Sequence, residues 1–263
     1  MPKSLSRNFL TFYKSYCVRG KVYIVGAGPG NFELLTLKAY RLLHEADVIL
    51  YDRLVGEEIE RFIKGLKNKK AIYVGKDRGE KGEKRQKVIN RLMKKYVEEG
   101  KIVVRLKGGD PAVFGRLIEE MEFLSRNNIP FEVVPGVSSV NAAPACSNIS
   151  LTHPEKGFGF LVVSGKEAGR IAELVKSGTV VVLMGGCTAK EVATNLIKSG
   201  INPDIEVAVI EKGSFKDQRV IFSTVKGLME TKNDFRSPAL IVIGGVVEIS
   251  KKFTGDKFKQ IWR

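Results

Sequence analysis

The sequence is poor in the residues that build metal centres and disulfide frameworks. Its three cysteines, Cys17, Cys146 and Cys187, lie far apart and show no CxxC spacing. An odd number of cysteines at these positions argues against both a disulfide framework and a zinc site. Only two histidines are present, His44 and His153, so histidine-based metal chemistry is poorly supplied as well. We therefore expect no metal site.

Long apolar runs are also missing from the chain. No stretch approaches the roughly 18 to 20 apolar residues that a membrane-spanning helix needs. Residues 1–20 show neither a sustained apolar run nor the small-residue cleavage site of a secretory signal. Because 43% of the 263 residues are apolar, the chain can still bury one large core or two moderate ones. We expect a cytoplasmic protein without a membrane partner.

Acidic residues are scarcer than basic ones. The chain has 44 Lys and Arg against 29 Asp and Glu, which gives a net charge of +15. The excess is concentrated in residues 1–20, 76–95 and 251–263, so the rest of the chain is close to neutral. A basic chain suits an anionic partner, but net charge alone does not distinguish nucleic acid, membrane or an acidic small molecule. Lysine-rich termini are commonly solvated, so the internal segment 76–95 is the informative one.

Short β-branched runs alternate with amphipathic stretches from Lys21 onward, which is typical of βαβ units. The pattern predicts helices after an N-cap at Thr36 and near 84–98, 114–127 and 188–199. Predicted strands fall in two series, at 21–26, 47–51, 70–75, 102–106 and 131–134, and at 158–164, 179–184, 206–211, 219–224 and 239–244. The fold class is therefore α/β. We expect two α/β domains with roughly five-stranded sheets, mostly parallel in the first and mixed in the second, and an active site in the cleft between them.

Pro135-Gly136 is the predicted joint between these domains, because a strand ends there and a Ser/Ala-rich segment begins. The predicted organisation is an N-terminal extension (1–20), an N-terminal α/β domain (21–135), a C-terminal α/β domain (136–247) and a basic C-terminal tail (248–263).

A glycine-rich loop, Gly26-Ala27-Gly28-Pro29-Gly30, follows the first predicted strand, where open α/β sheets bind ligands. One interpretation is a dinucleotide site, for which Asp52 has the spacing of the ribose-binding acid. Against it, Asn31 replaces the third glycine of GxGxxG, and Pro29 has no N–H to donate to a phosphate. A purely structural turn is the other alternative.

Two further loops lie at predicted strand ends. Residues 106–116 (LKGGDPAVFGR) combine paired glycines with a carboxylate that is followed by proline. Such a loop suits a flat ligand with a positive centre and hydroxyls better than one with phosphates. Residues 135–144 (PGVSSVNAAP) supply small side chains and hydroxyls. Each loop alone is a weak signal, but the three in order form a specific pattern.

Taken together, these segments resemble the tetrapyrrole methylase superfamily. The resemblance runs from about Lys21 to Val247 and is carried by VGAGPGNFELLTLKA, YDRLV, VRLKGGDPAVFGR, PGVSSVNAAPACSNISLTH, VVVLMGG, VAVIEKGSFKDQRV and SPALIVIG. Within the superfamily, residues 105–116 and 135–153 are most similar to members that act on uroporphyrinogen III. The resemblance implies S-adenosylmethionine (SAM) as methyl donor, methylation at C2 and C7 to precorrin-2 by way of precorrin-1, and a place in sirohaem or cobalamin biosynthesis. It also implies a homodimer and product inhibition by S-adenosylhomocysteine.

The resemblance also implies roles for individual residues. By this resemblance, Asp52 would accept a proton and Lys76 would donate one. Independently of it, each residue follows a predicted strand, so both side chains could reach the same edge of the sheet. Residues expected to contact SAM are Pro29, Gly108, Gly109, Asp110, Val113, Ser138, Ser139, Met184, Gly213 and Ala239. The concentration of positive charge that begins at Lys76, and not the resemblance, predicts which residues gather the carboxylates of uroporphyrinogen III: Arg78, Lys81, Lys84 and Arg85, to which we add Arg116.

The chain departs from the family pattern on the side of the tetrapyrrole. The run from Lys76 to Gln86 is one residue longer than usual and lacks a histidine. Cys146 stands where tyrosine is usual, and Pro154 where arginine is common.

Three alternatives remain open at this point. Other superfamily members methylate later corrin intermediates, the diphthamide precursor on a protein, or ribosomal RNA. Outside the superfamily, a dinucleotide-binding oxidoreductase and a nucleic-acid-binding module are the competing interpretations. The basic segments lack interleaved aromatic residues on which bases could stack, so we expect no nucleic-acid partner.

Overall fold

The computed structural model describes residues 20–75, 82–166, 178–232 and 235–254. The chain divides into two compact units. The first unit consists of Met1–Gly28 and Leu35–Gly136, and the second of Pro29–Leu34 and Val137–Arg263. The short segment Pro29–Leu34 thus belongs to the second unit, although the sequence pattern places it inside the first domain. A single domain boundary at Pro135-Gly136 does not account for the place of this segment.

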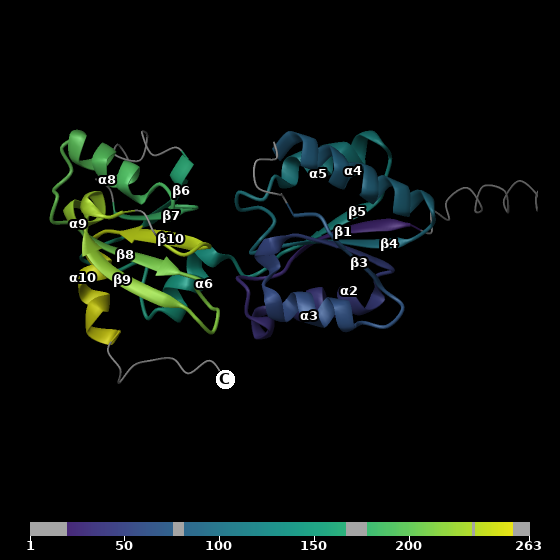
Figure 1. Cartoon of the computed structure of the whole chain (residues 1–263), viewed down its shortest axis with the longest axis horizontal. Helices are drawn as coiled ribbons and strands as arrows, with labels where there is room; N and C mark the ends of the chain where they lie inside the picture. The colour runs from purple at the N-terminus through teal and green to yellow at the C-terminus, as the bar shows by residue number, and fades with distance from the viewer. Residues whose placement is uncertain (1–19, 76–81, 167–177, 233–234, 255–263) are drawn as a thin grey trace, which may run out of the picture. The chain divides into compact units, whose positions relative to one another are not determined.

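A parallel five-stranded sheet forms the centre of the first unit (Figure 1). Its strand order is β3-β2-β4-β1-β5, and each neighbouring pair is parallel. The strands are β1 (Lys21–Gly26), β2 (Val48–Tyr51), β3 (Lys70–Tyr73), β4 (Ile102–Lys107) and β5 (Phe131–Val134). Because all five run the same way, the residues that follow β1, β2, β4 and β5 lie at one edge of the sheet.

Helices cover both faces of this sheet, with α2 (Leu37–Glu45) and α3 (Glu57–Gly65) on one side and α4 (Gly82–Glu98) and α5 (Leu117–Arg126) on the other (Figure 1). Ile24 and Leu50 of the sheet pack in one buried cluster with Met93 of α4 and Leu124 of α5. Burial on both faces explains why the strands are continuous apolar runs and not alternating ones.

Thr36 caps the start of α2, as the sequence predicts. Its Oγ1 accepts a hydrogen bond from the Ala39 amide at 3.1 Å.

Replacing Thr36 with alanine is expected to lower the free energy of unfolding by about 1 kcal/mol, because the first turn of α2 loses its side-chain acceptor. Urea denaturation monitored by circular dichroism measures the change. Thr36→Ser is the matched control, since serine keeps the acceptor, and a loss of equal size in both variants would contradict the capping role.

A mixed five-stranded sheet forms the second unit. Its order is β6-β7-β10-β8-β9, in which β6 and β7 are parallel and the other neighbours are antiparallel. The strands are β6 (Phe160–Ser164), β7 (Thr179–Leu183), β8 (Glu206–Glu211), β9 (Arg219–Thr224) and β10 (Ala239–Ile243). The predicted fold class, with a parallel first sheet and a mixed second one, is therefore confirmed.

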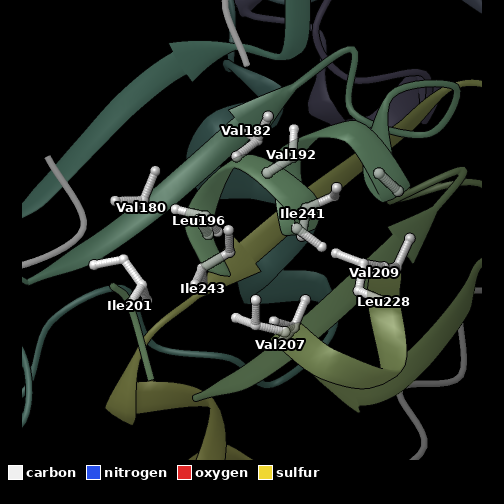
Figure 2. Close-up of a cluster of buried hydrophobic side chains, with 13 residues drawn as sticks. Val180, Val182, Val192, Leu196, Ile201, Val207, Val209, Leu228, Ile241 and Ile243 are labelled. Atoms are coloured by element: carbon white, nitrogen blue, oxygen red, sulfur yellow. The ribbon is translucent and has the colours of Figure 1, made fainter. Parts of the chain in front are cut away.

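The core of the second unit lies between this sheet and two helices, α8 (Ala189–Lys198) and α9 (Val225–Glu230). Figure 2 shows Val180, Val182, Ile241 and Ile243 of the sheet turned toward Leu196 of α8. Val181 and Val242 are also fully buried but lie outside this cluster, so the sheet is covered on both faces.

The second unit continues past the predicted end of the C-terminal domain. Helix α10 (Gly245–Ser250) contacts β8 and β10 and leads into the 3-10 helix η4 (Lys251–Phe253). Ser250 is buried, and the Phe253 carbonyl accepts a hydrogen bond from Asn148 Nδ2 at 3.0 Å. Residues 248–253, predicted to begin a basic tail, are therefore part of the fold. Within the described ranges, no helix has both the length and the apolarity to cross a membrane.

Candidate functional site

Glycine backbone fills the edge of the first sheet where β1, β4 and β5 end. Gly28 and Gly109 form a bridge, with hydrogen bonds of 3.2 Å from the Gly28 amide and 2.6 Å from the Gly109 amide. A Cβ atom on Gly26 would lie 2.6 Å from the Gly136 Cα and 2.7 Å from the Gly109 oxygen. A Cβ atom on Gly108 would lie 2.4 Å from the Leu54 Cβ. The edge is therefore a close-packed backbone surface that leaves no room for side chains at these positions.

Asp110 fastens the loop after β4 to the end of β5. Its Oδ1 accepts from the Ala112 amide at 2.8 Å, and its Oδ2 accepts from the Gly136 amide at 3.0 Å. The Val113 amide donates to the Asp110 carbonyl at 3.2 Å, so the loop turns directly after the carboxylate. Each carboxylate oxygen has a second lone pair, which leaves Asp110 able to accept a hydrogen bond from a ligand hydroxyl.

Asp52 lies directly after β2 and makes two contacts of different kinds. Its Oδ1 accepts from the Leu54 amide at 3.0 Å and so caps the 3-10 helix η2 (Arg53–Val55). Its Oδ2 pairs with Arg105 Nη2 at 3.2 Å. The Asp52 side chain is 24% exposed and that of Arg105 is 5% exposed. Asp52 is thus a carboxylate with access to solvent that is held by a buried cation.

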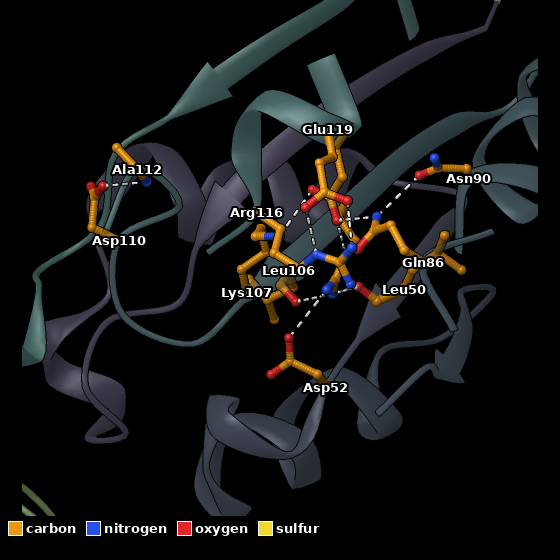
Figure 3. Close-up of polar contacts among 12 residues, drawn as sticks. Leu50, Asp52, Gln86, Asn90, Leu106, Lys107, Asp110, Ala112, Arg116 and Glu119 are labelled. Carbon is orange, nitrogen blue, oxygen red and sulfur yellow. Dashed lines mark hydrogen bonds and ion pairs between the residues drawn. The ribbon is translucent and has the colours of Figure 1, made fainter. Parts of the chain in front are cut away.

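Behind Asp52 lies a buried set of charges that the sequence analysis did not single out (Figure 3). Glu120 of α5 is fully buried, and its Oε1 accepts from Arg105 Nε at 3.2 Å and from Gln86 Nε2 at 3.2 Å. Its Oε2 pairs with Lys107 Nζ at 3.0 Å. Burial lowers the pKa of the Lys107 ammonium, and the Arg105 guanidinium lowers it further against the opposing effect of Glu120.

The residues predicted to bind the tetrapyrrole carboxylates differ in their exposure and in the contacts that they make. Lys84 is exposed near the start of α4. Arg85, one residue later, donates through Nε to the Val74 carbonyl at 3.0 Å and through Nη2 to the Gly75 carbonyl. It therefore also holds the end of the β3 segment against α4. Lys76, Arg78 and Lys81 lie outside the described residues.

Arg116 precedes α5 in a left-handed backbone conformation, with φ of 55°. Its guanidinium pairs with Glu119, and the Nε to Oε1 distance is 2.7 Å. The hydrogen bond from Arg116 lowers the pKa of the Glu119 carboxyl. An incoming carboxylate would therefore have to share Arg116 with Glu119.

The predicted SAM contacts of the second unit gather at one edge of its sheet. β7 ends just before Met184, and β10 begins at Ala239 beside it, since Leu240 pairs with Leu183. β8 ends at Glu211, which pairs with Ala239. Met184 has φ of 58° and is 45% exposed, which is unusual for a large apolar residue after a buried strand.

Gly213 lies two residues past β8 and approaches α6 (Ser139–Cys146). A Cβ atom on Gly213 would lie 2.2 Å from the Ala143 Cβ. Ser138 is the N-cap of α6, and its Oγ accepts from the Val140 amide at 3.3 Å. Ser138, Ser139 and Gly213 thus belong to one packed neighbourhood.

Pro29 joins this neighbourhood through its own loop. A Cβ atom on Gly30, which has φ of 129°, would lie 2.1 Å from Cζ of Phe215, two residues past Gly213. The second unit therefore brings together the segments that carry Pro29 and Gly213, and the first unit those that carry Asp52, Gly108, Gly109, Asp110 and Val113.

Sequence reasoning missed Arg105, Lys107 and Glu120. One signal was available, because Arg105 lies in a predicted strand, 102–106, that a parallel sheet covered on both faces would bury. Charged side chains at such positions need partners, but nothing in the pattern identified Glu120, which lies on α5.

The described residues contain no group of three or more His, Cys, Asp and Glu side chains placed to hold a metal ion. Cys146 is buried in α6, and burial raises the pKa of its thiol. A buried thiol with a raised pKa is a poor nucleophile and a poor metal ligand at neutral pH.

The chain is similar to known proteins over most of its length. It matches the family model described as tetrapyrrole (corrin/porphyrin) methylases over residues 21–228. It is 43% identical to a uroporphyrinogen-III C-methyltransferase of Bacillus subtilis, over 89% of this chain and 93% of that protein. It is 41% identical to a uroporphyrinogen-III C-methyltransferase of Methanocaldococcus jannaschii, over 88% of this chain and 98% of that protein.

A solved structure shares the fold as well. It is a uroporphyrin-III C-methyl transferase from Thermus thermophilus complexed with S-adenyl homocysteine, and the TM-score is 0.76 at 41% identity. The alignment covers 88% of this chain and all of that one, 100%. The chain belongs to the tetrapyrrole methylase family.

Proposed function

We propose that this protein transfers methyl groups from SAM to C2 and C7 of uroporphyrinogen III, giving precorrin-2 by way of precorrin-1. The observation that carries the proposal is the close identity, over nearly the whole of both chains, to relatives that bear this activity in their names. SAM supplies its own electrophilic methyl group, so the protein has mainly to bind and orient its two substrates.

Several residues of this chain fit SAM. Gly26 and Gly136 let the strand-end backbones of the first sheet pack closely, which brings the Asp110 loop to the end of β5. Asp110 has lone pairs left for ribose hydroxyls, and its negative charge favours a sulfonium ligand. In the second unit, Ser214 follows Gly213, and its buried Oγ has no hydrogen-bond partner among the described residues. The same positions would hold S-adenosylhomocysteine, which we expect to inhibit as product.

Asp52 is the residue we assign to proton removal. After a methyl group has been added, a ring C–H bond breaks, its electron pair stays in the macrocycle, and a base receives the proton. Asp52 is suited to this because its side chain is partly exposed and is held in place by Arg105. The proposed proton donor, Lys76, lies outside the described residues.

A direct assay tests the proposal. Purified protein is incubated with SAM and anaerobically prepared uroporphyrinogen III, and the products are followed by absorbance and mass spectrometry. We expect two methyl additions per tetrapyrrole. Transfer only to a later corrin intermediate or to RNA would replace the substrate and keep the reaction class, whereas failure to bind SAM would remove the class.

Lys84 gives a test of how the acidic substrate is gathered. Lys84→Ala is expected to raise the KM for uroporphyrinogen III about threefold and to weaken the dependence of KM on salt, because an exposed cation attracts the substrate carboxylates over about a Debye length. Initial rates at several ionic strengths measure both effects.

Lys101→Ala is the matched control for Lys84→Ala. Lys101 is also exposed, but it precedes β4 and so lies at the opposite edge of the same sheet. Equal effects of the two substitutions would show that Lys84 has no special place in substrate binding.

Two further expectations come from the family resemblance alone, a homodimer and a cytoplasmic location. Light scattering on the purified chain measures the first, and a dimer mass is the expected result.

A further inference from the structure

Four charged side chains of the first unit form a network in which positive and negative charges are equal in number. We define the charge network as Asp52, Arg105, Lys107 and Glu120. Arg105 connects the two carboxylates, through Nη2 to Asp52 and through Nε to Glu120. Lys107 pairs with the other oxygen of Glu120. Asp52 is the most exposed member, so it is the one that a substrate can reach.

Stability alone does not explain the charges at Lys107 and Glu120. Both side chains are buried, on β4 and on α5, where apolar side chains would fill the space between sheet and helix. Replacing a buried ion pair by well-packed apolar residues is commonly neutral or stabilising. Packing alone therefore does not require the charge of this pair, and Glu120 connects it to Arg105.

We propose that Lys107 and Glu120 are positioning residues that control, through Arg105, how strongly the Asp52 carboxylate holds a proton. The inference rests on the proposed function, in which Asp52 accepts a proton from the substrate. Glu120 fixes Nε of Arg105 and leaves Nη2 directed at Asp52. Lys107 neutralises Glu120, so the positive charge of Arg105 remains available to Asp52. Figure 3 shows, as dashed lines, the contacts that join Asp52 and Lys107 to the rest of the charge network.

Lys107 depends on Glu120 for its charge. Burial lowers the pKa of Lys107, and Glu120 is the largest influence that raises it. Removing either partner leaves the network with an unbalanced charge, whereas removing both restores equality between Arg105 and Asp52. A purely structural role for Lys107 and Glu120 does not predict that removing both residues restores what removing one of them changes.

The other charged side chains around the charge network either contact groups outside it or are exposed. On α5, Arg116 pairs with Glu119. On α4, Arg85 donates to carbonyl groups after β3. On α3, Glu60 accepts from Tyr51 and pairs with Lys64. Arg53, next to Asp52 in the chain, is exposed. The substitutions below leave all of these side chains unchanged.

The experiment follows the Asp52 carboxyl carbon by NMR in the full chain labelled with ¹³C at aspartate Cγ. The Asp52→Asn variant assigns the signal, and neither SAM nor a tetrapyrrole is needed. In Lys107→Met, the titration midpoint of Asp52 is expected to rise by roughly half to one pH unit, because Arg105 is then shared between two carboxylates without a second cation. In the double variant Lys107→Met with Glu120→Gln, the midpoint is expected to return to that of the wild type.

The double variant is the decisive comparison. If Lys107 and Glu120 only support packing, removing both disturbs the site more than removing one. An unchanged midpoint in Lys107→Met, or a double variant as shifted as the single one, overturns the proposal. Should Lys107→Met fail to fold, Glu120→Gln decides alone: a lower midpoint supports the proposal, and an unchanged or higher midpoint overturns it.

Enzyme kinetics give a second readout when methyl transfer is observed. The acidic limb of the pH profile of kcat is expected to follow the NMR midpoints across the same variants, with little change in KM for SAM. Because the titration requires no activity, a failed methylation assay and a failed titration are separate results.

Discussion

Replacing Asp52 with asparagine is expected to lower kcat for methylation of uroporphyrinogen III by roughly 100-fold to 10,000-fold, the usual range for removing a general base. Asparagine is close in shape, and its Oδ1 can still accept from the Leu54 amide, so η2 keeps its cap. What the substitution removes is the negative charge and the ability to take a proton. SAM affinity should stay within about twofold, because the glycine edge of the sheet is unchanged. Initial rates and calorimetric titration with SAM measure the two quantities.

Asp47→Asn is the matched control for this substitution. Asp47 precedes β2 by one residue, and its Oδ2 accepts from the Ile102 amide at 2.8 Å, at the start of β4. It therefore lies at the opposite edge of the same sheet from Asp52 and should leave turnover unchanged. If Asp52→Asn retains full turnover, the base must be another group.

The strands of this fold were predictable because each is a short apolar run bounded by polar or glycine-rich residues. β1, β5, β8 and β9 begin and end where the pattern placed them, and the others differ by one or two residues at an end. Helix α2 was equally readable, since its apolar residues recur on one face and Thr36 marks its start. These signals are local, so they survive without knowledge of the tertiary structure.

Other helices were missed for identifiable reasons. Helix α6 contains Pro144 and is rich in alanine, so it has little apolar periodicity and was interpreted only as a loop of small residues. Helix α3 is only nine residues long, but its apolar residues Ile59, Phe62 and Ile63 recur at helical spacing, so this helix was readable and was overlooked. The exchange of Pro29–Leu34 between units depends on the packing of Gly30 against Phe215, which no local pattern contains.

In the candidate site, too, local features could be predicted from the sequence, whereas contacts between distant segments could not. Its glycine loops were readable because glycine has few substitutes where backbones meet. The partners of its charged side chains were not: Arg85 was predicted to bind substrate, and its contacts with Val74 and Gly75 arise only once α4 packs beside β3. Likewise, the role of Arg105 depends on Asp52 and Glu120, which approach it from β2 and α5. Motifs indicate where chemistry occurs, while the charge state of the site is a tertiary property.

Replacing Gly136 with alanine is expected to lower the free energy of unfolding by about 3 kcal/mol, at the upper end for overpacking. The new Cβ atom would lie 2.5 Å from the Gly109 oxygen and 2.7 Å from the Gly26 Cα, whereas real Cβ contacts are essentially never under 3.0 Å. Both neighbours are backbone atoms of strand ends in the same sheet, so neither can rotate away as a side chain could. Relief requires β1, β4 and β5 to separate at this edge. Guanidinium denaturation of the full chain measures the loss.

Gly65→Ala is the control that isolates this effect. Gly65 is the last residue of α3, and a Cβ atom there would meet nothing within 4 Å. Alanine should therefore be neutral or stabilise slightly through its helix propensity. The Gly136 amide also donates to Asp110 Oδ2, so separating the strand ends displaces the carboxylate that we place near SAM. We expect Gly136→Ala to weaken SAM binding at least about tenfold under conditions where the variant is folded, since misplacing a binding group by an ångström carries a penalty of this order. Wild-type SAM affinity in folded Gly136→Ala would separate the packing role of this glycine from any role in the cofactor site.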